Sequence, residues 1–264
     1  MFLLEEFKNH LKINIDAPNT RINYRSRLNC FFSIYNNFTQ ENINGYLANQ
    51  LDKGKSKSWF NQTLAAFRCY EKMINEHFVY PKIKKIGKTE RDFLTEQEFN
   101  EILPYMPRLF EVKGGFYTFV LKLLFYTGIR QDELCKLQTK DINFEKQIFL
   151  VKTPKDRDDK IVPFPKRLIN EMKNYLQNDK NKAYPITQSI MDYIFAKLNN
   201  DLRYKKYLTA RMLRHSYAKY MLSLGIPVEK LQILMGHSNI QTTMIYAQPR
   251  REDAINAYFD KING

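Results

Sequence analysis

The sequence predicts a mainly α protein of two domains, with a small β-sheet or hairpin in the C-terminal domain. Apolar residues recur every three or four positions through most of its 264 residues. This period is interrupted only after Asp141, and a lysine-rich stretch separates two helical parts. We therefore expect residues 1–79 to form a helical domain, 80–93 a basic linker and 94–264 a second domain, since the chain exceeds the usual length of one domain.

Four amphipathic helices are expected in the first domain. Thr20 and Thr39 precede the second and third of them, and a threonine at this place caps a helix by accepting a hydrogen bond from its first turn. The apolar faces are formed in order by Leu3, Leu4, Phe7 and Leu11; by Tyr24, Leu28, Phe31, Phe32 and Tyr35; by Ile43, Leu47 and Leu51; and by a segment from about Ser58 to Ile74.

The second domain opens with a helix-start signal. Thr95 and Glu98 form the Thr-x-x-Glu capping box, in which each side chain bonds the backbone of the other residue. An apolar helix through 116–125 is expected to end at Gly128, and a short helix to cover 133–137.

A β-type insertion follows. Residues 148–151 and 160–164 are β-type runs on either side of the polar KTPKDRDD, which predicts a hairpin. After Lys166 the helical period returns, with breaks at Gly225 and Gly236, and a last amphipathic helix is expected over 254–262.

The amino-acid composition and the net charge indicate what kind of partner the protein binds. With 44% hydrophobic and 27% charged residues the chain is typical of soluble globular proteins, and its net charge of +14 favours a polyanion, most simply nucleic acid, over an anionic membrane surface. Residues 1–93 hold 15 basic and 9 acidic residues, and 94–264 hold 27 and 19. Both domains are basic, so one partner could be held between them as in a clamp.

The sequence does not indicate a membrane protein, a secreted protein, or a protein that binds a metal or a cofactor. No apolar stretch approaches the ~18 residues that span a bilayer. Glu5 and Glu6 stand where a signal peptide would have basic residues followed by an apolar block, so a cytoplasmic protein without membrane contact is expected. Three scattered cysteines, and the lack of metal-ligand or Gly-rich phosphate-loop spacing, predict neither a metal site nor a cofactor.

Three segments carry a constellation of reactive residues. They are Tyr126-Thr-Gly-Ile-Arg130-Gln-Asp-Glu-Leu134, Arg211-Met-Leu-Arg214-His215, and Leu234-Met-Gly236-His237 followed by Tyr246. His237 lies 23 residues after Arg214, and Tyr246 lies nine after His237. Taken together and in this order, the segments resemble the signature of the tyrosine recombinase (phage integrase) family, with simple Xer-like recombinases as the nearest type.

The resemblance implies a role for each residue. Arg130 and Arg214 would bind the two non-bridging oxygens of a DNA phosphate, because a guanidinium donates two parallel hydrogen bonds and stays charged. Tyr246 would be the nucleophile. A phenol is mostly protonated at neutral pH, so it needs a proton acceptor, for which His215 is expected, while His237 would support the phosphate.

The acid for the departing 5′ hydroxyl is expected on the hairpin. The family's lysine usually stands eight residues before the proline of the next strand, which indicates Lys155 from Pro163; Lys152, followed by a threonine, is the competing candidate. Arg211 stands where the family usually has histidine. It can still donate to a phosphate oxygen, but it cannot accept a proton. Glu133 matches an acidic position of the family that is expected to orient Arg130 or a neighbouring residue.

The resemblance implies a tyrosine recombinase catalytic fold behind a helical core-binding (SAM-like) domain. The implied activity is site-specific cleavage and rejoining of DNA strands through a 3′-phosphotyrosyl intermediate, for integration, excision or dimer resolution, without metal or ATP. The implied partners are double-stranded DNA and three further copies in a tetrameric synapse, with a monomer when free. A type IB topoisomerase-like enzyme, or a non-catalytic architectural or regulatory DNA-binding protein of the same fold, are the alternatives.

Overall fold

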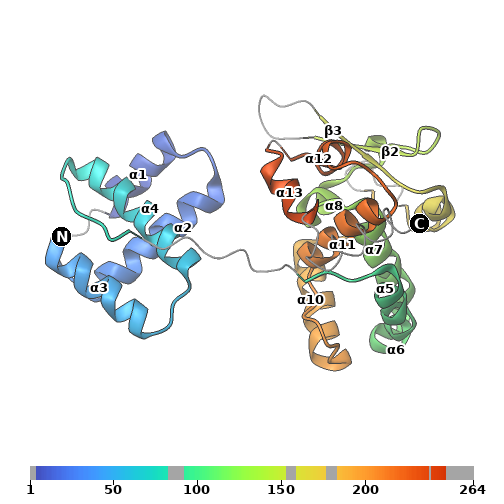
Figure 1. Ribbon diagram of the computed structural model, residues 1–264, viewed down its shortest axis with the longest axis horizontal. Helices are drawn as coiled ribbons and strands as arrows, with labels where there is room; N and C mark the ends of the chain where they lie inside the picture. The colour runs from blue at the N-terminus through green and yellow to red at the C-terminus, as the bar shows by residue number, and fades with distance from the viewer. Residues whose placement is uncertain (1–3, 83–91, 153–158, 177–182, 238, 248–264) are drawn as a thin grey trace, which may run out of the picture. The chain divides into compact units, whose positions relative to one another are not determined.

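The structure of the chain is a computed structural model that describes residues 4–82, 92–152, 159–176, 183–237 and 239–247. Its backbone contacts divide the chain into two compact units, residues 1–90 and 91–264. Helices make up most of both, and one three-stranded antiparallel sheet lies in the second (Figure 1). The predicted fold class, mainly α with a small sheet in the C-terminal part, is confirmed. In the part of the chain described, no helix combines the length and apolar character needed to cross a bilayer.

The first unit contains four helices, α1 (Leu4–Asn14), α2 (Pro18–Phe32), α3 (Gln40–Asp52) and α4 (Lys57–Ile74). Thr39 caps α3 as predicted, because its hydroxyl accepts a hydrogen bond of 3.3 Å from the Asn42 N–H. The start expected after Thr20 is wrong: α2 begins at Pro18, and Thr20 lies in its first turn. Proline suits this position because its φ is already helical and its missing N–H would have no partner there.

Aromatic packing joins these helices. Phe31 of α2 is fully buried, and its ring meets those of Phe38, Tyr46 and Phe67 edge to face at centroid distances of 5.2, 5.3 and 5.2 Å. Such edge-to-face contacts add to the free energy of burying the rings. The core of the first unit is therefore built around one phenylalanine that three other segments contact.

The second unit contains nine α-helices within its described residues. They are α5 (Glu96–Ile102), α6 (Met106–Phe110), α7 (Gly114–Thr127), α8 (Gln131–Lys136), α9 (Ile169–Tyr175), α10 (Gln188–Lys197), α11 (Ala210–Ser223), α12 (Val228–Met235) and α13 (Gln241–Ala247). Shorter helical turns connect them: η1 (Leu103–Tyr105), η2 (Glu111–Lys113), η3 (Thr139–Asp141), η4 (Lys166–Leu168) and η5 (Leu198–Leu202).

Helix α7 is the centre of this unit. It is apolar on almost every face, as expected of a helix surrounded by others, and it packs along α11. Phe125 stacks on Phe99 of α5 at 4.1 Å between ring centroids. The capping box of Thr95 and Glu98 is present at the start of α5, as the sequence predicts.

The predicted hairpin is confirmed and carries one strand more. β2 (Ile148–Val151) pairs with β3 (Lys160–Pro163), and β1 (Ile142–Asn143) adds to the free edge of β2. Two residues are too few to show an alternating pattern, so the sequence did not indicate β1. Lys160 stands opposite Val151 on the buried face of the sheet, and Figure 1 shows α12 beside β3.

Candidate active site

The first arginine of the motifs lies in the turn between α7 and α8. Gly128 ends α7 with a φ of +60°, and a Cβ there would lie 2.2 Å from the Tyr217 ring, so the turn needs a glycine. Arg130 then becomes the N-cap of α8. Its backbone N–H and its Nη1 both donate to the Glu133 carboxylate, at 2.8 and 2.6 Å. Glu133 therefore holds the Arg130 side chain within its own turn.

Arg214, the second arginine, is far more enclosed. It belongs to α11, is 8% exposed, and donates to the carbonyl oxygens of Gly128 and, at 2.5 Å, of Met235. Both carbonyls lie at the C-terminal ends of helices, where backbone acceptors have no partner and the helix dipole is negative. Burial, and then the charge of Arg130, lowers the pKa of Arg214 to about 10, which still leaves it positive at neutral pH.

His237 follows the left-handed Gly236 that ends α12. Its Nε2 lies 3.2 Å from Nη2 of Arg214, and its Nδ1 lies 2.8 Å from Oγ1 of Thr243. Because a guanidinium can only donate, Nε2 accepts in this contact, and Nδ1 carries the proton that it donates to Thr243. Thr243 is buried in α13, the helix of Tyr246, so this hydrogen bond fixes His237 to that helix.

The proposed nucleophile and its proton acceptor are in direct contact. Tyr246 Oη lies 2.5 Å from Nδ1 of His215, and the residues are 5% and 9% exposed. α11 packs against α13, so consecutive residues of α11 reach the two groups: Arg214 contacts His237, and His215 contacts Tyr246. The contact places an imidazole nitrogen within hydrogen-bond distance of the phenol oxygen.

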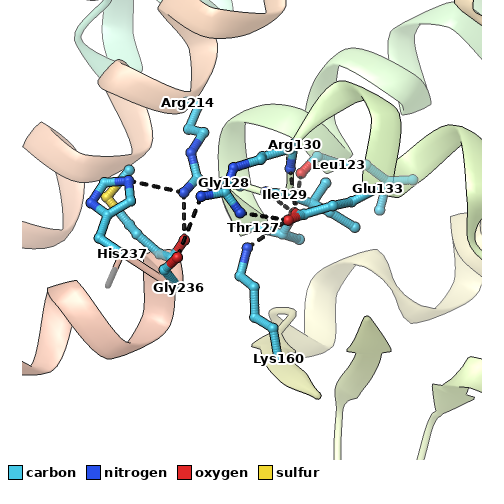
Figure 2. Close-up of polar contacts among 11 residues, drawn as sticks. Leu123, Thr127, Gly128, Ile129, Arg130, Glu133, Lys160, Arg214, Gly236 and His237 are labelled. Carbon is cyan, nitrogen blue, oxygen red and sulfur yellow. Dashed lines mark hydrogen bonds and ion pairs between the residues drawn. The ribbon is translucent and has the colours of Figure 1, made fainter. Parts of the chain in front are cut away.

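Arg130, Arg214 and His237 come from three separate segments to one place (Figure 2). Nη2 of Arg130 donates to the carbonyl oxygen of Gly236 at 3.3 Å, next to the carbonyl that Arg214 holds. Two guanidinium groups side by side repel each other, and an anion between them would relieve that repulsion. The arrangement is thus suited to bind a phosphate.

Sequence reasoning missed two residues of this region, Thr243 and Lys160. Lys160 is buried, and its Nζ donates to Glu133 Oε2 at 3.0 Å. A signal was available in the sequence. Lys160 stands two residues before the apolar Val162, and residues two apart in a strand point to the same face, here the inner one. For Thr243, its place three residues before Tyr246 put both on one helix face.

The other expected residues differ in position. Arg211 is exposed in the first turn of α11, on the side of the helix that Arg214 shares, and Lys152 is exposed just after β2. Lys155 lies outside the described residues, so the structure does not choose between the two lysines.

The chain is similar in sequence to known proteins. The profile of the phage integrase family matches residues 92–253. The tyrosine recombinase XerA of Pyrococcus furiosus is 31% identical over 263 residues, which cover 93% of this chain and 89% of that protein.

Solved structures share the fold. A Tn1549 transposon integrase fragment in complex with circular intermediate DNA superposes with a TM-score of 0.77 at 18% identity, covering 99% of this chain and 100% of that one. A lambda integrase dimer bound to a core site gives a TM-score of 0.71 at 20% identity, covering 94% and 95%. With a family match over most of its length and a tyrosine recombinase similar to it almost from end to end, this chain belongs to the phage integrase family and is a Xer-like tyrosine recombinase.

Proposed function

We propose that this protein is a site-specific DNA recombinase that cuts and rejoins strands through a 3′-phosphotyrosyl intermediate. The observation that carries the proposal is the 2.5 Å contact between Tyr246 and His215, made next to the pair of arginines and His237. A nucleophile with its proton acceptor, beside donors for a phosphate, is the set that phosphodiester cleavage requires.

The positions of these groups support the following proposed reaction. Tyr246 Oη attacks the phosphorus, passing its proton to His215, while Arg130, Arg214 and His237 bind the non-bridging oxygens on which negative charge gathers. The bond to the 5′ oxygen breaks as a lysine donates a proton to it. Attack on the phosphotyrosyl link by the 5′ hydroxyl of another strand reverses these steps, so rejoining draws on the energy of that link and needs no nucleotide.

In the resting structure His237 Nε2 accepts from Arg214, whereas binding a phosphate oxygen requires Nε2 to donate. The phosphate would therefore have to replace this contact, and His237 would take a proton on Nε2 while Nδ1 stays on Thr243. Arrival of DNA would then complete the site.

Double-stranded DNA is the partner that the charge favours. Both units carry excess positive charge, and contacts to phosphates supply most sequence-independent affinity for DNA. We propose that residues 1–79 act as a helical DNA-binding domain, 80–93 as a linker and 94–264 as the catalytic domain, and that four copies assemble on two DNA sites.

Covalent capture tests this function. The protein is incubated with a library of nicked duplexes, the complexes are denatured, and the DNA that stays attached is sequenced. We expect one family of sequences joined to the protein at a 3′ end. DNA binding without any adduct would instead indicate the non-catalytic alternative.

The two hairpin lysines are separated by a substrate with sulfur at the 5′ bridging position of the cut site, because a thiolate leaves without an acid. Lys155→Ala should cut the ordinary substrate poorly and the sulfur substrate at close to the wild-type rate, whereas Lys152→Ala should depend much less on the substitution. Single-turnover cleavage gels measure both rates. The reverse pattern would assign the acid to Lys152.

Assembly is tested by removing residues 252–264, which lie outside the described residues. We expect the shortened protein to bind one half-site normally, but to lose cooperative binding to paired half-sites and strand exchange, because the amphipathic pattern over 254–262 is proposed to dock on a neighbouring copy. Electrophoretic titration measures cooperativity. If cooperativity persists, the segment does not link subunits; an unfolded product would place it in its own core.

A further inference from the structure

One buried cation of the second unit has no part in the chemistry described so far. Lys160 is the only lysine that is buried among the residues the structure describes, and its side chain is 5% exposed. Burying an ammonium costs free energy unless a counter-charge and hydrogen bonds offset the lost hydration. Its surroundings should therefore explain why a lysine stands there.

The ammonium is bound to the partner of Arg130. Nζ of Lys160 donates to Oε2 of Glu133 at 3.0 Å, while Oε1 of the same carboxylate accepts from Nη1 of Arg130 at 2.6 Å. Oε2 also accepts from the backbone N–H of Arg130 at 2.8 Å. The carboxylate, itself 10% exposed in its side chain, is thus shared by two cations from different segments of the fold.

The aliphatic part of Lys160 contacts the other side of the site. A Cβ added to Gly236 would lie 2.7 Å from Cδ of Lys160, so the lysine chain packs directly on the turn that precedes His237. Figure 2 shows Lys160 reaching from the strand toward Glu133, beside Gly236. One side chain on β3 therefore contacts the turn of Arg130 and the turn of His237.

Burial and the neighbouring charges shift the pKa of both Lys160 and Glu133. Burial, and then the charge of Arg214, lowers the pKa of Lys160 to about 8 against the opposing effect of Glu133. Burial alone would raise the pKa of Glu133, but Lys160 and Arg130 outweigh it and lower that pKa. An apolar residue at this position would avoid the cost of burial, but it would leave Glu133 with Arg130 as its only cation.

We propose that Lys160 is a positioning residue of the active site, which fixes the Glu133 carboxylate so that it holds the Arg130 guanidinium toward the phosphate, and which supports the turn before His237. This inference rests on the proposed function. It assigns Lys160 no proton transfer to the DNA, which distinguishes it from the hairpin lysine that serves as the acid.

The first test replaces Lys160 by a residue of similar length without charge. Lys160→Met should slow formation of the covalent adduct about 10- to 100-fold under single-turnover conditions at saturating DNA, the usual loss for a residue that orients a reacting group. The dissociation constant for DNA should change little. Lys160→Arg, which keeps the charge, should recover part of the rate, and Lys146→Met removes an exposed lysine of the neighbouring turn as a matched control.

A second variant shows whether Lys160 acts through Glu133. Glu133→Gln removes the charge that Lys160 balances, so the double variant Lys160→Met/Glu133→Gln should cleave no more slowly than Glu133→Gln alone. Losses that multiply in the double variant would show independent action and overturn the proposal. The test still applies if Lys160→Met alone folds poorly. In the double variant residue 133 is uncharged, so it does not need the cation that Lys160 supplied.

A sulfur substrate completes the test. With sulfur at the 5′ bridging position, the deficit of Lys160→Met should remain; full rescue would make Lys160 the acid and overturn the positioning role. Wild-type protein in the same assay separates the two hypotheses. Failure of the wild type to form any adduct contradicts the proposed function, whereas a normal wild type with an unimpaired Lys160→Met variant contradicts this inference alone.

Discussion

Tyr246→Phe is expected to abolish covalent attachment to DNA while DNA binding persists. The change removes one oxygen, and loss of a catalytic nucleophile typically lowers the rate by about 10⁶-fold, which places the adduct below detection. The phenylalanine ring should keep the packing of Tyr246 against its buried cluster, which contains Tyr217, Leu231 and Met235. Denaturing gels with a nicked substrate measure the adduct, and a filter-binding titration measures affinity.

Tyr217→Phe is the matched control for this experiment. It removes the hydroxyl of another buried tyrosine in the same cluster, whose pKa burial raises to about 12, and it should leave adduct formation within a few-fold of wild type. An adduct that persists in Tyr246→Phe but disappears in Tyr217→Phe would assign the nucleophile to Tyr217.

Arg130→Ala and Arg214→Ala should each lower the cleavage rate by about 10²- to 10³-fold, the usual value of one donor to a developing negative charge. Binding should fall much less, because affinity is spread over many phosphate contacts. Arg108→Ala, an exposed arginine on α6, controls for the loss of one positive charge. Equal losses in binding and in cleavage would make the two arginines ordinary DNA contacts.

The two variants should differ in stability. Arg214 is buried and donates to two backbone carbonyls, and each acceptor left unsatisfied costs about 1–3 kcal/mol of unfolding free energy. The side chain of Arg130 is 39% exposed. In Arg130→Ala, the Glu133 carboxylate would still accept hydrogen bonds from Lys160 and from the backbone N–H of residue 130. Thermal unfolding should therefore show a clearly lower midpoint for Arg214→Ala only. A similar midpoint for both would mean that the carbonyls find other donors.

Much of this architecture was predictable because it is encoded locally. The capping box of Thr95 and Glu98, the cap at Thr39 and the left-handed Gly128 each depend on residues within one turn, so sequence spacing reveals them. Where local signals compete, spacing is less reliable. Both Pro18 and Thr20 are helix-start residues, and the structure uses the proline.

The candidate site also combines features that the sequence predicts with contacts that only the structure shows. By itself the sequence determined which residue types stand at which intervals, and hence that Arg130, Arg214, His215, His237 and Tyr246 belong together. Only the tertiary structure decided that Arg214 is buried between two helix ends, that Thr243 orients His237, and that Lys160 reaches Glu133. The contacts of Arg214 and Lys160 join residues 86 and 27 positions apart, and the contact of Thr243 joins α13 to the turn after α12. The physical reason is that water hydrates a lysine or an arginine at any exposed position. Burying either side chain costs free energy unless distant segments pack so that they supply acceptors in place of water.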